Sequence, residues 1–174
     1  MNLGIFANST LCLPALQYLT QSGHQIQLIL PSGSNPQHAE TEHYAQLLNC
    51  PIEKWSQSEL ETNILSWIET NQLSAIFVKT FPFFFPTKLL AQCKIPFLNF
   101  HYAPLPQYRG AQPVFWVIKK GEKRGAVVVH QFTEKVDSGD ILHEEIFELR
   151  ASETFGTYHT KAVKQAVRAT HQVL

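Results

Sequence analysis

The chain has few charged residues, and the two signs balance. Among its 174 residues, 14 are Lys or Arg and 14 are Asp or Glu, so the formal net charge at pH 7 is zero and the charged fraction is only 16%. A chain without net positive charge creates no long-range field that gathers polyanions. The composition therefore argues against nucleic acid as the main partner, while leaving room for a local basic patch.

Cysteine is also scarce, and long apolar runs are missing. The three cysteines, Cys12, Cys50 and Cys93, lie far apart and form no Cys-x-x-Cys spacing. This pattern predicts reduced thiols, no metal site and a cytosolic setting. No apolar stretch approaches the roughly 20 residues that span a bilayer, and the first residues carry no basic leader. We expect a cytoplasmic protein that does not enter a membrane.

What the chain does have is an alternation of short apolar runs with segments of helical period. Its first thirty residues follow a strand-helix-strand pattern, which is the unit of parallel α/β sheets. After residue 120, two strands follow each other without a helix between them. We therefore predict one domain, residues 1–174, with an open mixed α/β sheet that is parallel in its first half and has an antiparallel pair at one edge. The expected strands are 3–7, 25–30, 52–54, 75–78, 97–100, 125–132 and 141–149.

Helices are expected between these strands. Ser58, followed three residues later by Glu61, fits a capping box at the start of one of them. Pro113 fits the first turn of another, and Thr154 lies at the start of the last. The expected helices cover 13–19, 38–48, a segment from 58 to 68, a short segment ending at 90, 113–118, and 154 to about 173.

Three polar residues carry the chemistry that the sequence indicates. Asn99 and His101 lie two apart in an expected strand, so their side chains leave the same face, and Asp137 follows in an Asp-Ser-Gly turn. An amide donor, a base and an acid are the groups needed for acyl transfer to an amine. Taken singly, Asn99 fits a strand-end bridge, His101 a structural histidine and Asp137 a turn residue. Asp140 is a second candidate for the acid.

The complete pattern resembles a known enzyme family. Asn-x-His-x-x-x-Leu-Pro-x-x-x-Gly at 99–110, followed by Asp-x-Gly at 137–139, resembles the 10-formyltetrahydrofolate-dependent formyltransferases, which include methionyl-tRNA, nucleotide-sugar, peptide-synthetase and glycinamide ribonucleotide enzymes. The resemblance covers most of the chain and is strongest at 75–148. It implies a Rossmann-like formyltransferase fold, transfer of a formyl group from 10-formyltetrahydrofolate to a primary amine, and catalysis by Asn99, His101 and Asp137.

The resemblance also implies where the reduced folate binds. One wall is the loop 133–136, whose backbone receives the pterin ring, and the other is the segment 81–85. The cofactor-binding residues implied in this way are Phe81, Phe83, Thr133, Glu134, Lys135, Val136 and Asp140. An aromatic run such as 81–85 is also typical of a hydrophobic core, so that alternative stays open.

The acceptor is less well defined by the sequence. The resemblance implies that Tyr102 and Arg109 bind substrate, and Arg109 fits equally a contact with an anionic acceptor group or with a surface carboxylate. Pro82 and Tyr102 depart from the family pattern, which leaves the substrate and turnover open. The glycine-rich phosphate turn of the ribonucleotide enzymes is absent after residue 7.

We expect a small or carrier-bound amine, such as an amino-sugar nucleotide or an aminoacyl group, in preference to tRNA. The reasons are the zero net charge and the lack of residues here for the further carboxyl-terminal domain of the tRNA enzymes. The chain is expected either to stand alone or to be joined to further domains. Hydrolysis of the donor and a non-catalytic folate-binding role are the alternatives. We assign no role to the histidines at 24, 38, 43, 130, 143, 159 and 171.

Overall fold

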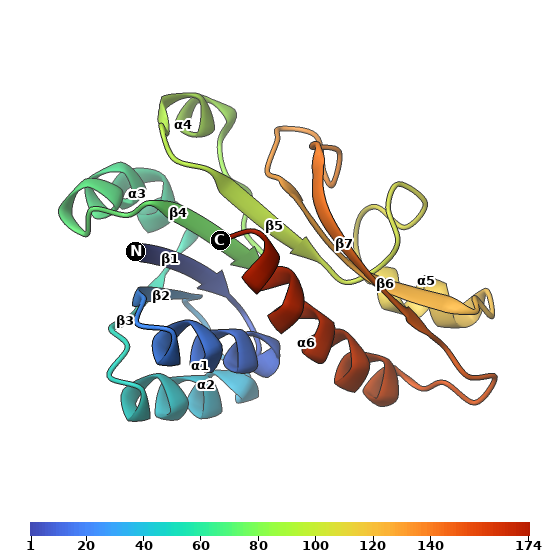
Figure 1. Ribbon diagram of the computed structural model, residues 1–174. Helices are drawn as coiled ribbons and strands as arrows, with labels where there is room; N and C mark the ends of the chain where they lie inside the picture. Colours follow the sequence, from blue (N-terminus) through green and yellow to red (C-terminus); the bar gives the residue numbers. More distant parts are fainter. The chain divides into compact units, whose positions relative to one another are not determined.

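The computed structural model describes residues 1–174 and contains one sheet of seven strands in the order β3-β2-β1-β4-β5-β6-β7 (Figure 1). The strands are β1 (Asn2–Ala7), β2 (Gln25–Pro31), β3 (Ile52–Trp55), β4 (Ala75–Lys79), β5 (Phe97–His101), β6 (Arg124–Gln131) and β7 (Ile141–Glu148). The helices are α1 (Leu13–Gln21), α2 (Pro36–Leu47), α3 (Gln57–Thr70), α4 (Thr87–Gln92), α5 (Pro113–Lys119) and α6 (Phe155–Gln172), and the 3-10 turn η1 (Thr10–Cys12) precedes α1. None of these helices combines the length and the apolar character that crossing a membrane requires.

Strand pairing confirms the predicted mixed sheet. β1 pairs in parallel with β2 and β4, and β2 pairs in parallel with β3. β6 and β7 are antiparallel, with a register shift at Val129 and His130, and β7 forms one edge of the sheet. All seven predicted strands are present within about two residues of their expected ends.

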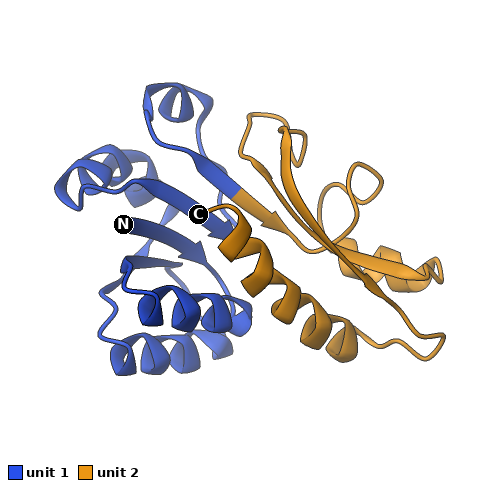
Figure 2. Ribbon diagram, viewed as in Figure 1, with its two compact units in different colours: residues 1–98 blue, residues 99–174 orange.

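The chain divides into two compact units, residues 1–98 and residues 99–174 (Figure 2). The boundary lies inside β5, between Leu98 and Asn99. Each unit is described separately below, and the expectation of a single domain stays a prediction.

The first unit is built on an aromatic core. Phe6 of β1 contacts the rings of Trp67, Phe81 and Phe85 at centroid distances of 5.4, 5.0 and 5.1 Å. On the same face of β1, a Cβ atom at Gly4 would lie 2.6 Å from the Trp67 ring, so only glycine lets α3 approach this closely. α1 and α2 lie side by side in the same unit (Figure 1).

The helix starts show one wrong prediction. The capping box of α3 is formed by Ser56 and Glu59, not by Ser58 and Glu61. Both pairs have the same spacing, and Ser56 has the extended backbone that an N-cap residue needs, while Ser58 already lies inside the helix. At α6, the side chain of Thr154 forms the N-cap, as the sequence indicates, and completes a capping box with Thr157.

In the second unit, α6 and the segment after β5 cover opposite faces of β6. Tyr158 of α6 is fully buried, and its hydroxyl donates to the Tyr102 carbonyl at 2.9 Å. A Cβ atom at Gly125 would lie 2.7 Å from the Tyr158 ring, so this face of β6 is closed by α6. The alternate residues Ala126 and Val128 cluster instead with Leu105.

Candidate active site

The structure brings the three predicted catalytic residues together within the second unit. Asn99 and His101 leave the same face of β5, and both reach the Asp137 carboxylate. The Asn99 amide Nδ2 donates to Asp137 Oδ1 at 3.1 Å. His101 Nδ1 lies 3.5 Å from Asp137 Oδ2, and these two side chains are only 7% and 10% exposed. The site lies at the carboxyl end of β5, where open α/β sheets generally bind their ligands.

The Asp-Ser-Gly turn has a geometry that explains its sequence. Asp137 has a backbone φ of 47°, in the left-handed region that Asp tolerates better than most residues. Two residues on, a Cβ atom at Gly139 would lie 1.9 Å from the Gln131 carbonyl oxygen. A side chain at 139 would therefore push the turn away from β6 and move Asp137 with it.

His130, to which the sequence assigned no role, is the fourth member of the cluster. Its Nδ1 faces the Gln131 carbonyl at 2.9 Å and must carry a hydrogen there. Its Nε2 lies 3.0 Å from the Asn99 amide nitrogen and 3.5 Å from Asp137 Oδ1. The histidine is 2% exposed. The sequence contains one weak indication of this role, since His130 is a polar residue directly after the apolar run 126–129. The histidine has no spacing to other residues that would suggest a ligand site.

Both ring nitrogens of His101 face oxygen acceptors. Nε2 lies 2.6 Å from the Tyr108 carbonyl, which can only accept, so Nε2 carries a hydrogen. Proton exchange with Asp137 must then pass through Nδ1. Burial lowers the pKa of His101 below its usual 6.5, although the Asp137 carboxylate and the Tyr108 carbonyl both favour the charged ring. The imidazole is therefore mostly neutral at pH 7, with an acceptor already in place for a second proton.

Asp137 is held as a carboxylate. Burial opposes its charge, but the contacts with His130, His101 and the Gly110 amide outweigh burial and lower its pKa. Gly110 N donates to Asp137 Oδ2 at 2.9 Å. Arg109 Nε donates to the Asp137 backbone carbonyl at 2.7 Å, a contact that neither interpretation of this arginine anticipated.

The residues predicted to bind the cofactor and substrate occupy diverse environments. Loop residues 133–136 are exposed, and the Lys135 carbonyl accepts the hydroxyls of Thr133 and Ser138. Asp140 is exposed, and its carbonyl accepts the Gln131 amide. Tyr102 is only 4% exposed. None of these positions tests the predicted roles, which stay predictions.

The aromatic segment of the first unit is partly core. Phe81 packs edge-on against Phe6 and Phe83, and Phe85 is 5% exposed. Phe84, by contrast, is 76% exposed. The core interpretation therefore holds for the rings of Phe81 and Phe85 that face Phe6, and the predicted folate contact of Phe81 and Phe83 is not tested by this packing.

An amide, two imidazoles and a carboxylate thus meet at the carboxyl end of β5, and groups of these types can donate hydrogen bonds and exchange protons. The family model "Formyl transferase" matches residues 5–174. The chain belongs to this family, whose members are enzymes that use 10-formyltetrahydrofolate as the formyl donor.

Individual relatives give the same class. A methionyl-tRNA formyltransferase of Alkaliphilus oremlandii is 31% identical over 155 residues, which cover 86% of this chain and 50% of the relative. The chain thus spans about half the length of the curated relatives that it matches.

Solved structures share the fold. The phosphoribosylglycinamide formyltransferase of Bacillus halodurans superposes with a TM-score of 0.83 at 17% identity, covering 100% of this chain and 95% of the other. A formyltetrahydrofolate deformylase of Pseudomonas syringae gives a TM-score of 0.82 at 14% identity, covering 98% of this chain and 58% of the other. At these identities the likeness establishes the formyltransferase fold alone.

Proposed function

We propose that this chain transfers the formyl group of 10-formyltetrahydrofolate to a primary amine, with Asn99, His101 and Asp137 as catalytic residues. The observation that carries the proposal is the convergence, at 3.1 and 3.5 Å, of Asn99 Nδ2 and His101 Nδ1 on the two oxygens of the same carboxylate, which is only 10% exposed. Three separate structural roles would not need this convergence, whereas it suits a site that transfers an acyl group.

The proposed reaction balances as follows. The neutral amine nitrogen attacks the formyl carbon and forms a C–N bond, and the carbonyl oxygen becomes an oxyanion. The bond between that carbon and N10 of the folate then breaks, so the electron pair returns to N10. One proton leaves the amine and one proton is delivered to N10, so a single proton held by the enzyme site suffices.

The hydrogen bonds support a role for each group in the proposed reaction. Asn99 uses its two amide hydrogens on Asp137 and His130, so donation to the oxyanion requires one of them to be exchanged. The bond to His130 is the weaker one, because the Asp137 acceptor is charged. His101 and Asp137 hold the travelling proton between Nδ1 and Oδ2. An oxyanion donor such as the Asn99 amide increases the rate by a factor on the order of 10²–10³.

We propose that the donor binds through the loop 133–136, Asp140, Phe81 and Phe83. Support comes from the exposure of this loop beside Asp137 and from the half-buried state of Phe81 and Phe83, which leaves ring surface for stacking. Calorimetry with the stable 5-formyl isomer should show saturable binding. No binding at millimolar ligand would remove this part of the proposal and favour a chain without donor affinity.

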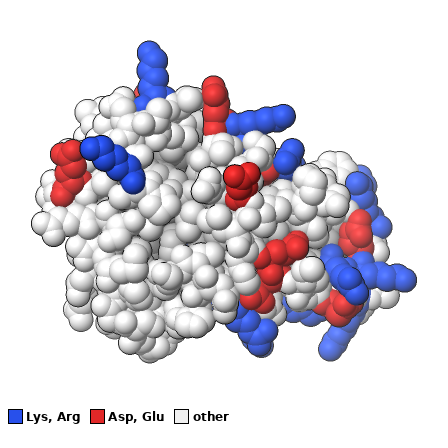
Figure 3. Space-filling view, turned by 45° about the horizontal axis from the view of Figure 1, so that its top comes forward, with Lys and Arg blue, Asp and Glu red and all other residues white.

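For the acceptor, we propose a small or carrier-bound amine, either an amino-sugar nucleotide or an aminoacyl group. Cations and carboxylates are interspersed on the face seen in Figure 3, and the net charge is zero. Phosphate recognition on tRNA normally uses clustered Lys and Arg. The names of the curated relatives favour methionyl-tRNA as the second candidate. Both candidates offer a primary amine as the nucleophile, so the proposed reaction is the same for each.

A competition assay decides between these acceptors. Methionyl-tRNA, a 4-amino nucleotide sugar and a carrier-loaded amino acid are offered together with 10-formyltetrahydrofolate, and the formylated product is identified by mass. We expect one of the two small acceptors to be formylated first; preferential formylation of the tRNA by this chain would contradict that choice. A further arm without any acceptor measures hydrolysis of the donor.

A further inference from the structure

Three consecutive residues after β5 hold both His101 and Asp137. The Tyr108 carbonyl accepts His101 Nε2 at 2.6 Å. Arg109 Nε donates to the Asp137 carbonyl at 2.7 Å, and Gly110 N donates to Asp137 Oδ2 at 2.9 Å. Two of these three contacts use the backbone of the segment, so the position of the segment 108–110 decides the positions of the imidazole and the carboxylate.

The segment is anchored on its other side by the Tyr108 side chain. The ring is 6% exposed, and its hydroxyl donates to the carboxylate of Glu122, in the turn between α5 and β6. The Lys120 ammonium lies 5.1 Å from the centre of the same ring. Burial and the Glu122 carboxylate raise the pKa of Tyr108 to about 12, so the phenol remains a donor across the neutral range.

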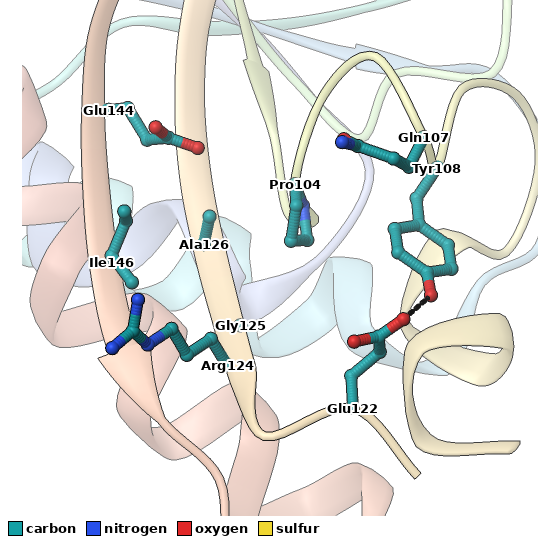
Figure 4. A pocket seen from close by; sticks show the side chains of 9 residues that line it. All are labelled: Pro104, Gln107, Tyr108, Glu122, Arg124, Gly125, Ala126, Glu144 and Ile146. Atoms are coloured by element: carbon teal, nitrogen blue, oxygen red, sulfur yellow. Dashed lines mark hydrogen bonds between the residues drawn. The ribbon is translucent and has the colours of Figure 1, made fainter. Parts of the chain in front are cut away.

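This anchor is accessible from outside. Tyr108 and Glu122 form one wall of a cavity of about 250 Å³, whose other side is formed by Arg124, Glu144 and Ile146 (Figure 4). The dashed bond in Figure 4 joins the Tyr108 hydroxyl to the Glu122 carboxylate. Glu144 lines the same cavity on the opposite wall and is not the acceptor of this bond.

We propose that Glu122 is a positioning residue of the active site, which acts through the Tyr108 hydroxyl to fix the segment 108–110 against His101 and Asp137. The proposal rests on the proposed formyl transfer for its consequence in turnover, but its structural part is independent of the acceptor and the donor. Glu122 touches none of the reacting groups. Its removal should therefore change the orientation of His101 and Asp137 without removing any group that takes part in the reaction.

The physical basis is the stiffness of the link. A tyrosine side chain has only two rotatable torsions, so fixing its hydroxyl and burying its ring limits how far its Cα and the adjoining backbone carbonyl can move. A hydrogen bond to a charged acceptor is about twice as strong as a neutral one. Without this bond the ring stays buried, so the segment should gain local freedom without unfolding the second unit.

The test compares four variants of the chain. Tyr108→Phe removes only the hydroxyl, and Glu122→Ala removes the acceptor. Glu122→Gln keeps a side-chain oxygen that can accept the phenol, but as a neutral acceptor, and should therefore recover part of the wild-type behaviour. Glu144→Ala is the matched control, because it removes a carboxylate from the same cavity without touching the bond to Tyr108. Melting temperatures establish that all four variants fold.

Hydrogen exchange gives the readout that does not depend on function. In Tyr108→Phe and Glu122→Ala, the Gly110 amide should exchange about tenfold faster, because its bond to Asp137 opens more often. The Val128 amide inside β6 should stay unchanged, which separates a local effect from general loss of stability. Unchanged Gly110 exchange in both variants would overturn the proposal.

Turnover gives the second readout. The kcat for formyl transfer should fall about five- to tenfold in Tyr108→Phe and Glu122→Ala while KM for the donor stays within about twofold, as expected when catalytic groups lose alignment and binding does not. Equal loss in Glu144→Ala would contradict a specific role of Glu122. If the wild-type chain transfers no formyl group to any acceptor, the proposed function fails, whereas the exchange data still decide on the anchor.

Discussion

The two units bury ionisable groups in opposite ways. In the first unit, Lys79 at the end of β4 is fully buried, and burial lowers its pKa from 10.5 to about 7. The nearby Cys12 thiol is also buried, and its pKa rises to about 12. In the second unit, the Asp137 side chain is only 10% exposed but stays charged, because His101, His130 and the Gly110 amide face it.

The two residues, Lys79 and Asp137, differ in what determines their pKa. Lys79 has the larger pKa shift, yet that shift comes mainly from loss of solvent. Asp137 combines low exposure with hydrogen-bond donors from β5 and the segment 108–110, and with the neighbouring His130 ring of β6. We therefore place the proposed catalysis at the convergence of several groups from different elements, and not at the residue with the more strongly perturbed pKa.

The largest effect is expected from removing the convergent groups. Asn99→Ala, His101→Ala and Asp137→Ala should each lower formyl transfer at least about 100-fold, because each removes an oxyanion donor or a proton carrier. Tetrahydrofolate release measures the rate, and melting temperature monitors the fold. Near-wild-type turnover in any two of these variants would remove the assignment of this cluster as catalytic.

The pH dependence of stability tests the buried lysine. The unfolded chain keeps the Lys79 proton up to pH 10.5, whereas the folded chain releases it near pH 7. Between these values the unfolded state binds more protons, so this lysine makes the free energy of unfolding rise with pH, by at most about 1.4 kcal/mol per pH unit.

Lys79→Met should lack this contribution. Urea unfolding of both proteins at pH 7 and pH 9 gives the difference, in which titrating groups that do not interact with Lys79 cancel, whereas the neighbouring Cys12 does not. The wild type should gain stability relative to Lys79→Met as the pH rises. A constant difference between the two proteins would show that Lys79 has an ordinary pKa, and the contrast between the units would then disappear.

His130 sharpens the comparison within the second unit. His130→Ala removes the partner of Asn99 and one neighbour of Asp137, and the loss of one such bond should reduce turnover about tenfold. His130→Gln retains an acceptor and should recover part of the rate. His143→Ala is the matched control, because His143 pairs with Glu145 on β7 at 2.8 Å and belongs to a separate pair. An equal rate for wild type and His130→Ala would exclude a role for His130.

The smallest effects are expected at two helix starts, one in each unit. Ser56→Ala removes the cap of α3, and Thr154→Ala removes the cap of α6. Each should reduce the free energy of unfolding by about 1 kcal/mol. Chemical denaturation measures both, and Ser58→Ala is the matched control for the first. A larger loss in Ser58→Ala than in Ser56→Ala would reverse the assignment of the cap.

Much of the fold could be predicted because its signals are local. Apolar runs, Gly23 after α1 and Pro113 at the start of α5 each act within a few residues. The cap of α3 was misplaced because two Ser-x-x-Glu pairs overlap in that segment, and local spacing cannot choose between them.

The site was only partly predictable, because its remaining contacts join distant residues. Asn99, His101 and Asp137 form a recognisable pattern, so their proximity was expected. His130 could not be selected from among eight histidines, because its place in the cluster depends on the neighbouring positions of β5 and β6 in the sheet, which bring it beside Asn99. The Tyr108 carbonyl and the Gly110 amide act through backbone atoms, which every residue has, so the sequence could not single them out.

The boundary between the units, inside β5, leaves the whole cluster on one contiguous piece of the chain. The four groups of the cluster all come from one continuous stretch between Asn99 and Asp137, entirely on one side of that boundary. Exchanging this single stretch for that of a relative would therefore replace all four groups at once, whereas mutations before Leu98 change none of them.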